Sequence, residues 1–68
     1  MHKSIVLDNA KDLSNLARQI ARDAKQVDSI ARNVEDERTR ENLRKRALSL
    51  LERAEDISRV ASRIANEL

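Results

Sequence analysis

The sequence predicts an all-α protein, a single antiparallel hairpin of two long helices that spans residues 1–68. Three observations favour this fold. The chain contains no Gly, Pro, Trp, Tyr or Phe, so it lacks the usual turn residues of β-structure. Apolar residues recur every seven positions in both halves of the chain, which is typical of helices that pack along one face. The two repeats are out of phase, and this predicts a reversal of the chain between them.

The first helix is expected at about residues 4–33. Ser4 is its expected N-cap, and Asn33 is suited to the left-handed conformation that ends many helices. Its apolar stripe combines two seven-residue series. One is aliphatic and the other consists of alanines: Val6, Leu13, Ile20, Val27 and Val34; Ala10, Ala17, Ala24 and Ala31.

The second helix is expected at about residues 37–67, after a turn at about residues 34–37. Its repeats are Leu43, Leu50, Ile57 and Ile64, and Ala47, Ala54 and Ala61. They are displaced by two residues from the first repeats, whereas a continuous coiled coil absorbs insertions of three or four. Asp36 is the expected N-cap with Glu37 in the first turn, and Thr39 is a competing cap.

A pairing register follows if facing residue numbers add up to 74. Each of seven layers then places an alanine against a large aliphatic residue, and the alanine alternates between the helices. Small residues let two helices approach closely while the opposing side chain fills the space. The predicted helix–helix interface is therefore Ala10, Leu13, Ala17, Ile20, Ala24, Val27, Ala31, Leu43, Ala47, Leu50, Ala54, Ile57, Ala61 and Ile64.

Apolar residues outside these layers predict a second contact surface. A short chain has difficulty in burying a sufficient core alone, and an exposed apolar strip usually marks association. We expect two hairpins to form a homodimeric four-helix bundle. The candidate dimer face is Leu16, Ile30, Leu48, Leu51 and Val60.

The same composition argues against an enzyme. There is no Cys and only one His, His2, so neither a thiolate metal site nor a nucleophile with an imidazole base is available. A phosphate loop requires Gly. We expect no cofactor, no metal and no small-molecule substrate, and we expect carboxylates to form a solvated surface with helix-supporting pairs. The expected pairs are Asp28–Arg32, Glu41–Lys45 and Glu55–Arg59.

The charge and hydropathy of the chain indicate where the protein is located and whether it binds nucleic acid. No apolar run approaches a membrane span of about 20 residues, and no signal-peptide pattern is present, so a cytoplasmic location is expected. The start of the second helix is locally basic, but acidic residues dilute this charge and there are no aromatic residues for base stacking. Nucleic-acid binding is therefore a minor alternative. The basic residues are Arg38, Arg40, Arg44, Lys45, Arg46 and Arg53.

The turn region also resembles a helix–turn–helix segment of the vinculin and α-catenin family. In that pattern an acidic turn residue precedes basic residues and then Glu-Asn-Leu. The matching residues are Asp36, Arg38, Arg40, Glu41, Asn42 and Leu43, within about residues 28–57. The resemblance implies a helical bundle that acts as a cytoskeletal adaptor. This chain differs in having only two expected helices and no aromatic, Cys or Pro residues, and no partner site of the family has matching residues here.

Three functions follow as hypotheses. The leading one is a structural self-association module without catalytic activity. The second is an adaptor-like protein-binding module whose apolar face accepts a partner helix, and the third is a weak basic nucleic-acid binder. The restricted composition also favours an engineered or de novo origin, whereas the irregular Asn, Ser and Gln content is typical of natural sequences.

Overall fold

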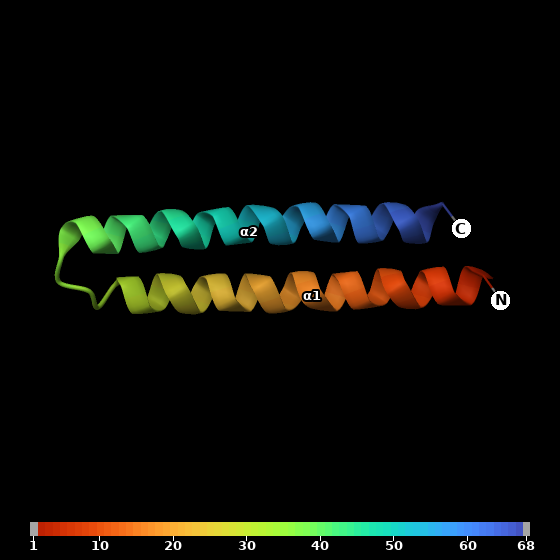
Figure 1. Cartoon of the computed structure of the whole chain (residues 1–68), viewed down its shortest axis with the longest axis horizontal. Helices are drawn as coiled ribbons and strands as arrows, with labels where there is room; N and C mark the ends of the chain where they lie inside the picture. The colour runs from red at the N-terminus through yellow and green to blue at the C-terminus, as the bar shows by residue number, and fades with distance from the viewer. Residues whose placement is uncertain (1, 68) are drawn as a thin grey trace.

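The protein is an all-α hairpin, as predicted. A computed structural model describes residues 2–67, with the side chain of His2 excluded. Helix α1 spans His2–Ala31 and helix α2 spans Glu37–Asn66. The helices run antiparallel along each other, with the turn at one end of the molecule (Figure 1). The result is a rod with extents of 54 × 13 × 10 Å.

Helix α1 is shifted by two residues from its predicted bounds. Ser4 lies in the first turn of the helix rather than at its N-cap, and the helix ends at Ala31 rather than Asn33. No described residue has a positive φ angle, so the left-handed conformation expected at Asn33 does not occur. The chain leaves α1 through tighter i→i−3 bonds instead, in which Asn33 N donates to Ile30 O and Val34 N donates to Ala31 O, each at 3.1 Å.

Helix α2 begins with the predicted cap. A carboxylate oxygen of Asp36 accepts a hydrogen bond from Thr39 N at 3.1 Å and another from the Thr39 hydroxyl. The hydroxyl bond and then the backbone bond lower the pKa of Asp36 from its ordinary value of 3.8. Thr39 is therefore a donor to the cap and not the cap itself.

An arginine of α2 forms a hydrogen bond with the turn. Arg40 Nη1 donates a hydrogen bond of 3.3 Å to Val34 O, and the Val34 side chain is half-buried. A backbone carbonyl in the turn is thus satisfied without glycine or asparagine in a special conformation. This bond helps to hold the turn against the start of α2.

Candidate association interface

The seam between the helices is built from alanine. Every alanine of the predicted layers is at most 4% exposed. These residues are Ala10, Ala17, Ala24, Ala31, Ala47, Ala54 and Ala61. They recur every seven residues on each helix, so one stripe of small side chains faces the other helix along its whole length. The exact pairing across the seam stays a prediction.

The large residues of the same layers are not enclosed. All seven are half-buried, and no large side chain among the described residues is fully buried. A large side chain at the edge of a narrow two-helix seam has a neighbour on one side only, so its outer surface stays in water. These residues are Leu13, Ile20, Val27, Leu43, Leu50, Ile57 and Ile64.

The five residues of the candidate dimer face do not share one face. Leu16, Ile30, Leu48 and Val60 are exposed, and Leu51 is half-buried. Leu51 lies in a hollow beside Ser14 and Ala21 of α1. Val60 follows Leu51 by nine residues, which rotates it by roughly 180° around α2. The single strip expected from the sequence is therefore divided between opposite sides of the hairpin.

The side that carries Leu51 has a trough between the helices in the half of the hairpin away from the turn. Two adjoining hollows of about 230 and 270 Å³ share Ser14 and Arg18 in their walls. We define the trough by six uncharged residues that lie along it: Leu7, Ser14, Ala21, Leu51, Ser58 and Ala65. Small side chains at four of these positions leave room for another helix to approach closely.

The opposite side carries both apolar and charged residues. Leu16 and Ile30 are separated by Asp23, which is exposed. On α2, a hollow on that side is lined by the half-buried Leu50 and by Ser49, Arg46 and Arg53. The trough hollows are themselves lined by Lys11, Arg18 and Glu55 and by none of the seven large layer residues. Since the cores of protein interfaces are depleted in charged residues, the trough has no advantage as a dry interface.

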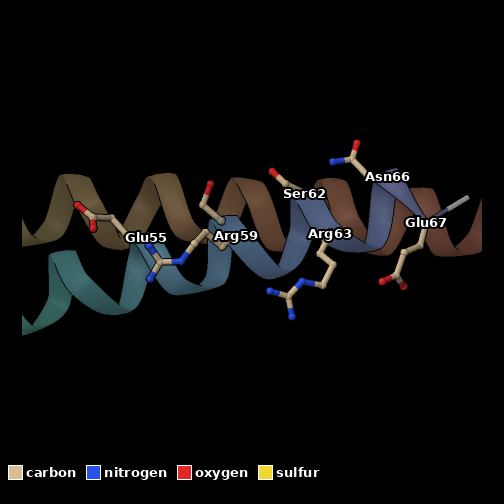
Figure 2. A pocket seen from close by; sticks show the side chains of 7 residues that line it. Glu55, Arg59, Ser62, Arg63, Asn66 and Glu67 are labelled. Carbon is tan, nitrogen blue, oxygen red and sulfur yellow. The ribbon is translucent and has the colours of Figure 1, made fainter.

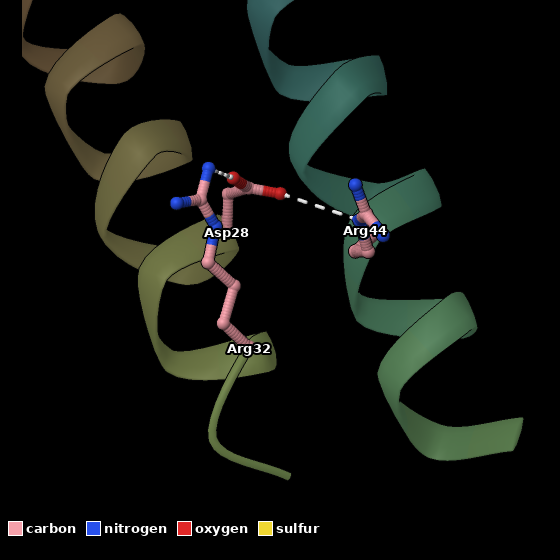
Figure 3. A network of polar contacts seen from close by, with 3 residues as sticks. All are labelled: Asp28, Arg32 and Arg44. Atoms are coloured by element: carbon pink, nitrogen blue, oxygen red, sulfur yellow. Dashed lines mark hydrogen bonds and ion pairs between the residues drawn. The ribbon is translucent and has the colours of Figure 1, made fainter. Parts of the chain in front are cut away.

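Polar contacts concentrate near the turn. Asp28 of α1 pairs with Arg32 at 3.2 Å and with Arg44 of α2 at 3.7 Å (Figure 3). The first of these pairs confirms the predicted helix-supporting contact. Arg59 pairs with Asp56 rather than with the expected Glu55. No ion pair joins Glu41 and Lys45 in the described part of the chain.

A wider hollow of about 650 Å³ lies on the outside of α2 (Figure 2). Its walls include Glu55, Arg59, Arg63 and Glu67, which project from a single helix into solvent. Ligand sites enclose most of their ligand within a concave, mostly apolar surface. This open and charged depression does not have that form.

Few of the described residues have the chemistry of a metal, membrane or nucleic-acid site. Within residues 2–67 no group of three or more His, Cys, Asp or Glu residues is placed to hold a metal ion. The side chain of His2 lies outside the described part. No helix described here is both long enough and apolar enough to cross a membrane.

Two arginines of the basic cluster at the start of α2 make contacts within the hairpin. Arg40 donates a hydrogen bond to Val34 O, and Arg44 pairs with Asp28.

Comparison with known proteins adds no relative. No protein-family model matches the chain, and no curated protein or solved structure shows significant similarity to it.

Proposed function

We propose that this protein is a non-catalytic self-association module, in which two hairpins pack into a four-helix bundle. One observation carries the proposal: the hairpin exposes far more surface than a compact chain of its size. Its accessible surface is 5714 Å². A compact monomer of the same mass exposes about 4,400 Å².

The excess is comparable to the area buried in a stable protein–protein contact. A standard interface covers about 800 Å² on each partner, and the excess here is larger. The radius of gyration of 15.7 Å also exceeds the value of about 11 Å for a compact domain of this length. Packing a second hairpin against the first would thicken the rod and cover its half-buried aliphatic residues.

Sedimentation equilibrium over a wide concentration range tests the proposal, with helicity followed by circular dichroism. We expect a highly helical species of twice the chain mass at low micromolar concentration. Its melting temperature should rise with protein concentration, because dissociation accompanies unfolding. A helical monomer at all concentrations would contradict self-association.

A monomer would favour the second function, an adaptor-like module that accepts a helix from another protein. The exposed Leu48 and the half-buried Leu51 support this alternative, since an amphipathic helix docks through such apolar contacts. Vinculin-like and α-catenin-like function is part of this alternative and rests on the motif from Asp36 to Leu43. Nucleic-acid binding would instead show an affinity that falls steeply with salt.

A further inference from the structure

We infer that the second copy packs on the side of the hairpin opposite the trough, and that Asp23 of each copy faces Arg46 and Arg53 of the other. This inference rests on the proposed self-association and specifies its geometry. The positions of the large aliphatic residues and the charges beside them support it.

The seven large residues of the alanine layers lie together on that side, which we call the aliphatic flank. All of them except Leu43 follow a buried alanine by three residues, as Leu13 follows Ala10, and Leu43 lies one repeat before the next of them. The trough residues Ser14 and Ser58 instead follow an alanine by four. An α-helix turns by roughly 100° per residue, so these two positions lie on opposite sides of the alanine. Because residues at the fourth position on both helices line one hollow, those at the third position share the other side.

Exposed apolar residues extend the aliphatic flank on both helices. Leu16, Ile30 and Val60 each follow a buried alanine by six residues, which places them roughly 60° beyond the layer residues. The layer residues are only half-buried, so a second copy seated here would cover apolar side chains along most of the rod. The surface that the hairpin exposes beyond a compact monomer is large enough for one such contact.

The two edges of this flank carry opposite charge in the half nearer the turn. Among the described residues of the α1 edge, Asp23 is the one that is charged, whereas the α2 edge has Arg46 and Arg53 and then Glu67 at its far end. These edge residues are all exposed: Asn9, Leu16, Asp23 and Ile30 on α1, and Arg46, Arg53, Val60 and Glu67 on α2. Further out, the charged residues are of both signs: Asp12, Asp56 and Arg63.

Asp23 lies at a height between the two arginines of the other edge. The ion pair between Asp28 and Arg44 gives the two helices a common height near the turn. With a rise of about 1.5 Å per residue, Asp23 is roughly 8 Å further from the turn than that pair. On the same scale Arg46 and Arg53 are roughly 3 and 14 Å further from it.

Two symmetric arrangements bring flank against flank. If the twofold axis runs along the helices, each α1 lies beside the partner's α2, both turns are at the same end, and each residue keeps its height. Asp23 of one copy then faces the two arginines of the other, twice in the dimer. If the axis runs across the helices, each helix lies beside its own copy, and Arg53, near the middle of α2, faces a second Arg53. Because like charges across an interface are unfavourable, charge selects the first arrangement.

Two matched substitutions test the choice of face. Leu16 and Leu48 are both exposed, but Leu16 borders the aliphatic flank, whereas Leu48 lies one repeat from Glu55 in the wall of the trough. We expect Leu16→Lys to raise the dimer dissociation constant in sedimentation equilibrium at least about tenfold, and Leu48→Lys to change it by less than about threefold. Circular dichroism checks that both hairpins stay helical. Greater weakening by Leu48→Lys would overturn the assignment of the face.

Charge reversal tests the contact between the two edges. Asp23→Arg adds a cation beside the two arginines, and we expect it to weaken association about tenfold. Asp12→Arg makes the same change further from the flank and should weaken it by less than about threefold. Adding Arg46→Glu and Arg53→Glu to Asp23→Arg restores opposite charges only if α1 lies beside the partner's α2, so it should recover most of the affinity. No recovery would count against that arrangement.

The chain contains no Cys, so one engineered thiol reports the arrangement directly. The variant Asn33→Cys places a nitroxide label in the exposed turn, and double electron–electron resonance measures the distance between the two labels. Turns at the same end give a distance well below the 54 Å length of the rod. A distance near that length would overturn the inference but leave self-association intact. A monomer by sedimentation would overturn both.

Discussion

Asp28 Oδ1 lies 3.7 Å from Arg44 Nε and joins α1 to α2 close to the turn. The other oxygen of the same carboxylate contacts Arg32 at 3.2 Å. Asp28 is near the C-terminus of α1, where a negative charge is unfavourable with the helix dipole. The two guanidinium groups offset this charge, and one of them also connects the helices.

We expect Arg44→Gln to lower the free energy of unfolding by at most about 1 kcal/mol at low salt, because Arg44 is exposed and Asp28 is only half-buried. The loss should shrink as salt is raised, since screening weakens such pairs. Urea denaturation at fixed protein concentration measures both values. Arg59→Gln is the matched control, because Arg59 pairs with Asp56 within α2. A loss for Arg44→Gln that does not respond to salt would exclude an ionic origin.

The cap at Asp36 predicts a dependence of stability on pH. The pKa of Asp36 is lowered in the folded chain, so the folded state binds its proton less readily than the unfolded chain. The cap therefore stabilises fully above the unfolded pKa, and its contribution is lost as the pH falls through the folded value.

The variant Asp36→Asn separates the effect of the carboxylate charge from that of the cap hydrogen bond. Asparagine also caps helices, but its side chain does not titrate at acidic pH. The melting temperatures of both proteins should be compared from about pH 6 to about pH 2. We expect any advantage of the native chain to disappear at the acidic end. A difference that stays constant over this range would show that the charge of Asp36 has no role.

The alanine seam predicts a strong response to enlargement. Ala24 is fully buried, so Ala24→Leu should destabilise the hairpin by about 1–3 kcal/mol through overpacking. The predicted register places Leu50 opposite Ala24. Adding Leu50→Ala should therefore recover part of the loss. Gln19→Leu, at an exposed position of α1, controls for the added apolar side chain.

Thermal unfolding at one protein concentration compares these variants. A double variant that is no more stable than Ala24→Leu alone would argue against the predicted register. The ion pair between Asp28 and Arg44 agrees with it only approximately, because the register places Asp28 opposite Arg46. A long arginine side chain spans that offset, so the contact does not decide the register.

Sequence periodicity predicted much of this fold because the signals were strong and local. Seven-residue spacing identified the alanines that prove to be buried, and Asp36 caps α2 through the side-chain bond that its residue type favours. The left-handed conformation expected at Asn33 was wrong, because i→i−3 bonds to Ile30 and Ala31 close the helix without a left-handed residue.

The candidate dimer face was harder to predict, because it depends on rotation around each helix. Leu51 and Val60 are both apolar and both lie outside the alanine layers. The position of α1 against α2 shows that Leu51 borders the trough and that Val60 lies on the opposite side of the hairpin. Repeat spacing locates a residue along a helix, whereas the choice between the two flanks of a seam needs the position of the neighbouring helix.

The alanine seam also has a calorimetric consequence. Alanine has no side-chain rotamers to lose, so burying the alanines costs little side-chain entropy. Closing the hairpin removes these small groups from water completely but the seven large aliphatic side chains only in part. The change in heat capacity on unfolding scales mainly with apolar surface. In the proposed dimer, the larger share of that change therefore belongs to separation of the two copies, and a scanning calorimeter would record assembly more than the pairing of α1 with α2.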